Sequence, residues 1–321
     1  MRKNKSKLLV ITPVRHIRGV INLLAENCEI TFLEDPNTEE VQKNIENYDV
    51  IFTNPNKSRV YIGAELLEKA KRLKVVCTAS TGTNHIDKNF LKEKGIKLIS
   101  LTEEREVINR ISSTAELAFA LTLMSVRKTP QAQNSVLNGK WDYTKYIGRQ
   151  MDCLTIGVIG YGRLGSMYAK YCAAFNARVI VYDPFKSTGG IFEEAKSISD
   201  LVKDSNIISL HVHVAPETVN MINGNIIKHL KSNVIFVNTS RGDLINEIDF
   251  VNFLKNNPEA VLATDVLSDE VRNRNQSPLL KFAQTSEQVI ITPHIGGMTI
   301  DAQEIAYQHA AKMLNAFLKS I

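Results

Sequence analysis

Residues 154–165 read LTIGVIGYGRLG, and they are the most informative part of the sequence about the fold. A mostly apolar run at 154–159 has the character of a buried strand, and it leads into glycines at 160, 162 and 165 with GxGxxG spacing. Helix-compatible residues 164–175 follow, and a second apolar strand at 178–182 ends at Asp183, which is 183 − 160 = 23 residues after the first glycine. Chance produces such glycine spacing easily, so the order strand, turn, helix and strand carries the inference. It predicts a Rossmann unit that binds a dinucleotide.

Each part of this fingerprint has a separate physical task. Gly160 permits the tight turn, Gly162 lets a pyrophosphate approach the backbone, and Gly165 lets the helix pack closely on the strand. The N-terminus of the helix presents N–H groups and a partial positive charge to the phosphates. Asp183 would accept hydrogen bonds from the ribose hydroxyls and would repel a 2′-phosphate, which favours NAD over NADP. The alternatives are a glycine turn without a ligand and an ordinary Asp-Pro turn at 183–184.

Outward from this stretch, short apolar runs alternate with segments of helical periodicity along most of the chain. The expected strands are residues 8–12, 29–33, 50–53, 74–77, 97–100, 154–159, 179–182, 207–211, 234–238, 261–265 and 289–292. Strands that alternate with helices run parallel and carry helices on both faces. The chain is therefore predicted to be an α/β protein with two doubly wound parallel-sheet domains. Residues 112–128 and 301–319 are expected to be helices, and the polar segment 102–109 a hinge loop.

Length, composition and charge narrow the class of protein further. A chain of 321 residues favours two domains, and 44% apolar with 23% charged residues is typical of a soluble globular protein. The net charge of +5 is small and scattered, without the basic, aromatic-interleaved stripe of a nucleic-acid-binding protein. No apolar run approaches the ~18 residues of a membrane span. The apolar run at 8–11 is also too short for a signal peptide, so we expect a cytoplasmic protein without nucleic-acid or membrane partners.

The four cysteines, Cys28, Cys77, Cys153 and Cys172, are widely spaced and form no CxxC pair. This spacing predicts small buried apolar residues rather than disulfide partners or metal ligands. We therefore expect a reducing compartment and no metal site.

Polar residues follow three expected strands of the second series. The strand at 234–238 leads to Arg241, the next leads to Glu270, and the last leads to His294. Carboxyl ends of parallel strands share one edge, so these side chains are expected to converge there. A 2-hydroxy acid needs a cation for its carboxylate, a base for its hydroxyl proton and an acid that orients the base, which Arg, His and Glu supply. Each residue alone is more often a solvated or structural group, and only the set of three favours catalysis.

Six blocks of sequence carry a resemblance to a known family: residues 80–87 (STGTNHID), 112–116 (SSTAE), 157–165, 238–243 (NTSRGD), 264–266 (TDV) and 292–297 (TPHIGG). In this order they resemble the D-isomer-specific 2-hydroxyacid dehydrogenases, and among them most closely the phosphoglycerate dehydrogenases. The resemblance extends over residues 57–308.

This resemblance implies roles for individual positions. The family's catalytic Arg, Glu and His fall on Arg241, Glu270 and His294, the residues that the strand ends had already indicated. The cofactor residues implied are Gly160, Gly162, Arg163, Leu164, Gly165, Asp183, His211, Thr239, Ser240, Asp265, Gly296 and Gly297. The substrate residues implied are Ser80, Thr81 and Gly82, with Lys57 and Arg59 in a basic loop that faces the far end of the substrate.

The family's layout also implies domain bounds and a partner. It places an NAD-binding Rossmann domain at 105–293, inserted into a flavodoxin-like substrate domain at 1–104 that is completed by residues 294–321. The loop around Trp141 would contact a second copy in a homodimer. Two departures from the family pattern stand out: His213 occupies the place of a usual proline, and 269–276 lacks the usual acidic-proline run.

The sequence therefore predicts an NAD-dependent dehydrogenase that interconverts a small D-2-hydroxy acid and its 2-oxo acid. A compound like 3-phosphoglycerate is one candidate substrate. A dinucleotide-sensing protein of the corepressor type, built on the same fold, is the alternative from another class, and an NADP-dependent reductase is a second alternative.

Overall fold

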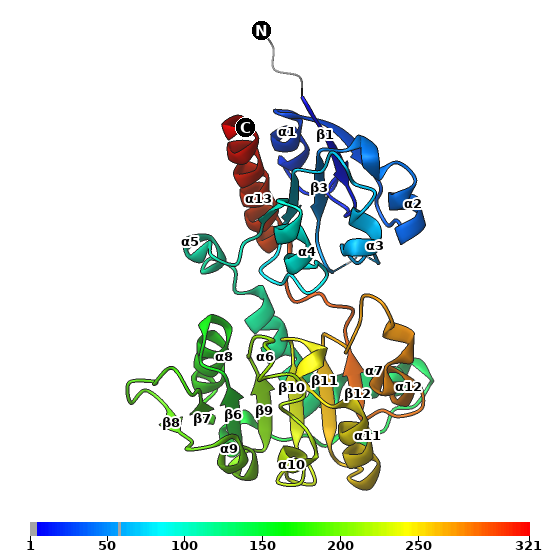
Figure 1. Cartoon of the computed structure of the whole chain (residues 1–321). Helices are drawn as coiled ribbons and strands as arrows, with labels where there is room; N and C mark the ends of the chain where they lie inside the picture. The colour runs from blue at the N-terminus through cyan, green and yellow to red at the C-terminus, as the bar shows by residue number, and fades with distance from the viewer. Residues whose placement is uncertain (1–4, 57–58) are drawn as a thin grey trace. The chain divides into compact units, whose positions relative to one another are not determined.

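The computed structural model describes residues 5–56 and 59–321, and these residues form two compact units. Unit 1 comprises the described residues up to Ile111 together with Gly297–Ile321, and unit 2 comprises Ser112–Gly296. The sequence of unit 2 is thus inserted into that of unit 1, and each unit contains one parallel sheet (Figure 1). The α/β class with two doubly wound sheets is confirmed. The more exact bounds at 104 and 293 stay a prediction.

Unit 1 has a five-stranded sheet in the order β2-β1-β3-β4-β5, with every pairing parallel. This is the flavodoxin-like order: β2 lies on one side of β1, and the later strands β3, β4 and β5 are added on the other side. Its strands are β1 (Ser6–Val10), β2 (Cys28–Phe32), β3 (Val50–Thr53), β4 (Val75–Thr78) and β5 (Lys97–Ile99). Its helices are α1 (Val20–Ala25), α2 (Thr38–Gln42), η1 (Ile45–Asn47), α3 (Ala64–Leu67), α4 (Lys88–Glu93), α5 (Arg105–Ile108) and α13 (Ile300–Ser320).

The C-terminal helix α13 returns to the N-terminal part of the chain and packs beside α1 (Figure 1). Its apolar residues Ala306, Ala310 and Leu314 are buried in the same cluster as strand residues of the sheet. The Tyr307 ring lies 6.1 Å from the Phe52 ring of β3. The expectation of an amphipathic helix at the tail is confirmed, and this helix belongs to unit 1.

Segment 102–109 differs from the expectation of a hinge loop, because Arg105–Ile108 forms the short helix α5. Because most residues of this segment are polar or charged, its pattern gave no sign that Ile108 is buried. Ile108 is 5% exposed and joins the core cluster of unit 1, which fixes a single helical turn despite the polar sequence around it.

Unit 2 has a seven-stranded, wholly parallel sheet in the order β12-β11-β10-β9-β6-β7-β8. The sheet starts at β6, with β7 and β8 added on one side and β9 to β12 on the other. This is the Rossmann arrangement, in which the ligand crevice lies at the switch point between β6 and β9. The strands are β6 (Thr155–Ile159), β7 (Arg178–Tyr182), β8 (Glu193–Glu194), β9 (Ile207–Leu210), β10 (Ile235–Asn238), β11 (Val261–Thr264) and β12 (Val289–Ile291). The α-helices are α6 (Ser113–Val126), α7 (Thr129–Leu137), α8 (Arg163–Ala174), α9 (Ile198–Asp204), α10 (Gly224–Ile227), α11 (Glu247–Asn256) and α12 (Pro278–Ala283). Single turns of 3₁₀-helix are η2 (Thr144–Tyr146), η3 (Met151–Cys153), η4 (Gly242–Leu244) and η5 (Arg274–Gln276).

The thiols follow the prediction in three cases out of four. Cys28, Cys77 and Cys172 are buried, and burial raises the pKa of Cys28 to about 11 and that of Cys172 to about 12. Cys153 is exposed, so its predicted burial is wrong. It ends the 3₁₀ turn η3 ahead of β6, where the chain is still at the surface.

Among residues 5–56 and 59–321, no helix is both long and apolar enough to cross a membrane. In the same residues, no three His, Cys, Asp or Glu side chains gather closely enough to hold a metal ion.

Candidate functional site

The glycine turn joins β6 to α8 at the switch point of the unit 2 sheet. Gly160 has a φ of 91°, which is in the left-handed region that favours glycine, and a Cβ there would also meet the His211 carbonyl. A Cβ on Gly165 would overlap the Gly160 carbonyl oxygen, so only glycine lets α8 start this close to the strand. A Cβ on Gly162 would meet no atom of the described chain within 4 Å. The turn therefore leaves open space at the position expected to face a pyrophosphate.

The N-terminus of α8 faces the same turn. Gly162 is its N-cap residue and offers no side chain to satisfy the first N–H groups of the helix. These groups and the helix dipole suit the binding of an anion. Arg163 and Leu164 are the first residues of α8, where the resemblance places them against a pyrophosphate.

Asp183 follows the end of β7 and is tied directly to the glycine turn. One carboxylate oxygen accepts from the N–H of Tyr161 at 2.7 Å, and the other accepts from the N–H groups of Phe185 at 2.9 Å and Lys186 at 3.1 Å. The Lys186 ammonium also lies 5.2 Å from the centre of the Tyr161 ring. Asp183 thus fixes the turn, and it stands at the place where the fingerprint expects the group that binds ribose.

Two polar atoms at the strand ends of unit 2 are buried without a hydrogen-bond partner among the described residues: His211 Nδ1, after β9, and Thr239 Oγ1, after β10. His211 follows β9, and its Nε2 pairs with Ser209 Oγ at 2.9 Å. Burial lowers the pKa of His211 to about 3, so its imidazole is neutral. Orphaned polar atoms at a strand end suit a polar ligand. With the open space at Gly162, they make this crevice a fitting site for a dinucleotide.

Arg241 lies in a tight turn just after β10, and the last residue of that strand, Asn238, closes the turn. The Asn238 side chain donates to the Arg241 carbonyl at 2.9 Å and accepts from the Ser240 N–H at 2.9 Å. Ser240 Oγ in turn donates to the Leu210 carbonyl at 2.6 Å, which ties the turn to β9. The guanidinium folds back to donate to the Ser240 carbonyl at 2.5 Å. The strand end therefore fixes the backbone on which this cation stands.

Asp265 organises the loop that follows β12. Its carboxylate accepts from Thr292 Oγ at 2.5 Å and from the N–H groups of Ile295 and Gly296, both at 2.8 Å. Burial raises the pKa of Asp265, although these hydrogen bonds and the charge of His294 act against that rise. His294, between the two ends of this clamp, has a φ of 55°, a left-handed conformation that is rare for a residue with a side chain. The clamp holds that conformation.

His294 is paired with Glu270, as the sequence predicted for a base and its orienting acid. Nδ1 of His294 donates to Oε1 of Glu270 at 2.5 Å, and each side chain is 15% exposed. The other Glu270 oxygen accepts from the Leu267 N–H at 3.2 Å. Because Nδ1 is engaged with Glu270, a proton exchanged with a substrate would have to pass through the other ring nitrogen, Nε2.

The charges around this pair support one another. Burial alone raises the pKa of Glu270, but the hydrogen bond and charge of His294, the Leu267 N–H and the Arg241 cation together leave that pKa below its ordinary value. Burial lowers the pKa of Arg241, against the opposing effect of Glu270, Asp243 and Asp265. Arginine stays charged even so. A cation, an ionised carboxylate and an imidazole are thus gathered at one edge of the sheet of unit 2.

The described candidate substrate residues, Arg59, Ser80, Thr81 and Gly82, lie in unit 1 after strands β3 and β4. Ser80 Oγ donates to the Gly82 carbonyl at 2.7 Å, which draws the Ser80–Gly82 segment into a tight loop, and Thr102 Oγ donates to the Thr81 carbonyl at 2.9 Å. Arg59 pairs with Asp35 at 3.3 Å. Lys57 lies outside the described residues. The roles of all these residues, and of Gly297, remain predictions.

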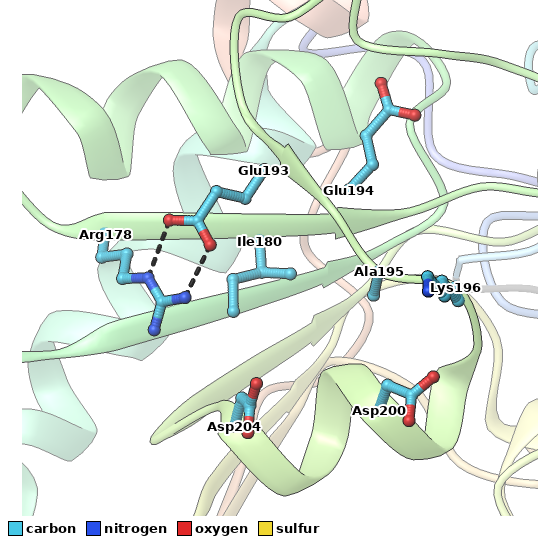
Figure 2. Close-up of a pocket in the computed structure, with 8 residues that line it drawn as sticks. All are labelled: Arg178, Ile180, Glu193, Glu194, Ala195, Lys196, Asp200 and Asp204. Carbon is cyan, nitrogen blue, oxygen red and sulfur yellow. Dashed lines mark hydrogen bonds and ion pairs between the residues drawn. The ribbon is translucent and has the colours of Figure 1, made fainter.

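A surface hollow of unit 2 lies away from these strand ends (Figure 2). It contains Arg178, the first residue of β7, whereas Asp183 follows the last residue of that strand. Arg178 and Glu193 form a bidentate pair there, with N–O distances of 2.8 and 2.6 Å. The hollow therefore lies toward the amino end of β7, opposite the crevice of the glycine turn.

The sequence missed two residues that hold the site together. Asn238 is 1% exposed and closes the Arg241 turn, and Thr292 donates to Asp265. Both are polar residues at or just beyond the end of an apolar strand, the same signal that identified Arg241 and His294. Asn238 bonds only the backbone of its own turn, and the partner of Thr292 lies 27 residues away, so the sequence gave no reason to single out either residue.

The fold and this site define a dinucleotide-binding α/β protein with an Arg, Glu and His group at its strand ends. Residues 119–296, which are 178 of the 321, match the family described as "D-isomer specific 2-hydroxyacid dehydrogenase, NAD binding domain". The chain belongs to the D-isomer specific 2-hydroxyacid dehydrogenase family, as its sequence blocks indicated, and NAD is the cofactor that unit 2 is built to bind.

Similar proteins extend the comparison to both units. A D-3-phosphoglycerate dehydrogenase of Archaeoglobus fulgidus is 33% identical over 92% of this chain and 54% of its own length. A hydroxypyruvate reductase of Thermotoga maritima is 33% identical over 87% of each chain. The crystal structure of a D-lactate dehydrogenase from Aquifex aeolicus, complexed with NAD and lactic acid, matches with a TM-score of 0.80 and 29% identity, covering 98% of this chain and 96% of that one. The chain spans about half the length of the phosphoglycerate dehydrogenases that it matches.

The open space at Gly162 leads to a first prediction. Gly162→Ala is expected to fold normally, because among the described residues its Cβ meets no atom beyond its own turn, and to weaken NADH binding about tenfold by occupying the approach of the pyrophosphate. Fluorescence titration with NADH and a thermal melt measure the two effects. Gly165→Ala is the contrasting variant, because its Cβ overlaps the Gly160 carbonyl, and it should lower the melting temperature instead. Unchanged NADH affinity in Gly162→Ala would contradict this placement of the pyrophosphate.

Proposed function

We propose that this protein is an NAD-dependent dehydrogenase that interconverts a small D-2-hydroxy acid and its 2-oxo acid. The observation that carries the proposal is the His294–Glu270 hydrogen bond of 2.5 Å, with the partly buried Arg241 cation acting on Glu270, at the strand ends of a domain that binds NAD. The similar proteins are named as a phosphoglycerate dehydrogenase, a hydroxypyruvate reductase and a lactate dehydrogenase, and these names support the reaction class. They differ in substrate, so the particular acid is left to experiment.

The three side chains divide the chemistry between them. Arg241 binds the carboxylate and polarises the oxygen on C2 of the substrate. In the oxidising direction Nε2 of His294 takes the hydroxyl proton, and in the reducing direction it returns one. Glu270 stays ionised, because its pKa is lowered, and it stabilises the imidazolium that forms. Bound NAD supplies the acceptor for the hydride that leaves C2.

The remaining assignments follow the family pattern. For the cofactor we propose Gly160, Gly162, Arg163, Leu164, Gly165, Asp183, His211, Thr239, Ser240, Asp265, Gly296 and Gly297. Of these, Asp265 already uses both carboxylate oxygens on the loop of His294, so its part includes holding that loop. For the substrate we propose Ser80, Thr81, Gly82, Lys57 and Arg59.

A panel of 2-oxo acids tests the proposed function. Pyruvate, hydroxypyruvate and 3-phosphohydroxypyruvate are each mixed with the protein and NADH, and the loss of NADH absorbance is followed. At least one acid is expected to be reduced, and NADPH should serve less well, because Asp183 follows β7 at the place where the fingerprint would put a 2′-phosphate. Tight binding of NADH without turnover of any acid would favour the dinucleotide-sensing alternative.

We propose further that the protein is a homodimer. Five large apolar side chains lie exposed within twelve residues of unit 2: Val136 at 48%, Leu137 at 77%, Trp141 at 91%, Tyr143 at 79% and Ile147 at 67%. The helix α7, which holds the first two, has no buried residue. Such a concentration of exposed aromatic and aliphatic surface is typical of a protein interface, and a second copy is the partner that the family pattern indicates.

The dimer proposal predicts a change of mass in one double variant. Leu137→Asp with Trp141→Asp places two charges among these exposed apolar side chains and should convert a particle of about twice 35.9 kDa into one of 35.9 kDa. Light scattering coupled to size exclusion measures the mass. Phe185→Ser removes a side chain that is 96% exposed elsewhere in unit 2, and it should leave the dimer intact. A monomeric native protein would overturn the proposal.

We also propose a cytoplasmic location. The buried thiols Cys28, Cys77 and Cys172 support it, since free thiols are typical of reducing compartments.

A further inference from the structure

Glu247 is a buried carboxylate that the reaction chemistry does not use. It is the first residue of α11 and follows the turn of Arg241 by six positions, yet it is only 5% exposed. Burial of a carboxylate away from water is unfavourable unless hydrogen bonds compensate for the lost hydration. Its position at a helix N-terminus contributes favourably, because the dipole there attracts negative charge. The donors that complete its environment come from another segment of the chain.

These donors lie at both ends of the loop that carries Glu270. One Glu247 oxygen accepts from the Ser268 N–H at 2.8 Å. The other accepts from Ser277 Oγ at 2.6 Å and from the Leu279 N–H at a longer 3.5 Å. Between these anchors, residues 272–276 are exposed to solvent. One side chain therefore pins the start and the end of a loop whose middle has little other burial.

The first anchor lies close to Glu270. The Leu267 N–H donates to Glu270, and the next N–H along the chain, that of Ser268, donates to Glu247. Gly242, the neighbour of Arg241, packs so tightly on the peptide between Leu267 and Ser268 that a Cβ there would overlap it. A shift of this peptide would displace Glu270 and disturb the turn of Arg241 together.

The backbone just before Glu270 also needs an external hold. Asp269 has a φ of 48°, a left-handed conformation that costs free energy for a residue with a side chain. Such a conformation persists where the surroundings fix it. The bond from Glu247 to the neighbouring Ser268 N–H supplies that restraint from a rigid helix end.

We propose that Glu247 is a positioning residue: its carboxylate holds the loop from Ser268 to Ser277 so that Glu270 meets Nδ1 of His294. It does not touch the substrate or the cofactor. The inference rests on the proposed function for its effect on turnover, but its structural core, the alignment of Glu270 with His294, is independent of which acid is reduced.

Kinetics of Glu247→Ala test the effect on turnover. The variant is expected to lower kcat between about 10- and 100-fold, since small misplacements of catalytic groups have effects of that size. NADH affinity is expected to change less than about threefold. The substrate is whichever of pyruvate, hydroxypyruvate and 3-phosphohydroxypyruvate the native protein reduces. Glu247→Gln keeps an oxygen for the Ser268 N–H and should restore most of the lost kcat.

A double-mutant cycle separates positioning from general stability. If Glu247 acts through Glu270, Glu247→Ala should change kcat less than about threefold in a Glu270→Gln background. An equal loss in both backgrounds would overturn the proposal, and so would unchanged kcat in Glu247→Ala with only a lowered melting temperature. If Glu247→Ala does not fold, Ser277→Ala removes the 2.6 Å donor and is judged by the same cycle.

Asp249 provides the matched control. It stands two residues further on in α11 and accepts from the Gly224 N–H at 2.8 Å, so it also ties a neighbouring segment to this helix. That segment does not carry a catalytic residue. Asp249→Ala should lower the melting temperature and leave kcat within about threefold of the native value.

A spectroscopic signature tests the inference without turnover. In protein labelled with ¹⁵N-histidine, the low-field proton on Nδ1 of His294, assigned by its loss in His294→Ala, should broaden or vanish in Glu247→Ala and persist in Asp249→Ala. An unchanged resonance in Glu247→Ala would overturn the inference even if the enzyme is active. An altered resonance in a protein that reduces none of the three acids would contradict the proposed function and leave the positioning role standing.

Discussion

His294→Ala is expected to reduce turnover of the 2-oxo acid by about 10³-fold or more while NADH still binds. The imidazole is proposed to be the only group that exchanges a proton with the substrate oxygen, and general acid–base catalysis of this kind contributes about 10²–10⁴-fold. Alanine also removes the side-chain hydrogen bond to Glu270, which leaves only the Leu267 N–H and the Arg241 charge to lower the pKa of that carboxyl. Steady-state assays that follow the loss of NADH absorbance give kcat, and fluorescence titration gives the NADH affinity.

Unit 1 offers a matched control for that variant. His309 pairs with Glu104 at 2.7 Å through Nε2, so it is a second His–Glu pair, although it uses the other ring nitrogen and is more exposed. His309→Ala removes the same side chain from the same kind of partner and should leave kcat within about threefold of the native value. Near-normal turnover in His294→Ala, with His309→Ala as active, would remove His294 from the reaction.

The parts of the site that the sequence predicted are those encoded by local pattern. The glycine turn needs three glycines within six residues, and steric contact alone explains Gly160 and Gly165 in the structure. Arg241 and His294 were found because an apolar strand that ends in a polar residue points to the crevice of a parallel sheet. The tail helix was predicted from its 3.6-residue period, which needs no knowledge of its partner.

The parts that escaped prediction depend on contacts between distant segments. Glu247 resembles any acid in the first turn of a helix until Ser268 and Ser277 are brought against it. The left-handed conformation of His294 follows from the clamp at Asp265, which sequence spacing does not reveal. Helix α5 depends on the burial of Ile108 in a core built from both ends of unit 1. In each case tertiary contacts override the local preference.

Arg241→Gln is expected to lower kcat/KM for the 2-oxo acid by about 10³-fold, because loss of one group that stabilises charge in a transition state costs about 10²–10³. A further loss comes from the surroundings. The Arg241 cation lowers the pKa of both Glu270 and Asp243, so its removal leaves half-buried carboxylates without their counter-charge. Steady-state assays over a range of 2-oxo acid concentrations measure kcat/KM, and NADH affinity should change little.

Arg241→Lys separates the charge of this residue from its shape. Lysine keeps the positive charge beside Glu270 but lacks the planar fork that holds a carboxylate with two parallel hydrogen bonds. It should therefore recover about tenfold of the loss in Arg241→Gln, and no more, if orientation of the substrate is part of the role. Arg272→Gln removes a charge of the same sign from an exposed residue of the Glu270 loop and should leave kcat/KM within about threefold. Equal losses in Arg241→Gln and Arg272→Gln would mean that net charge alone matters, and Arg241 would then have no specific place in substrate binding.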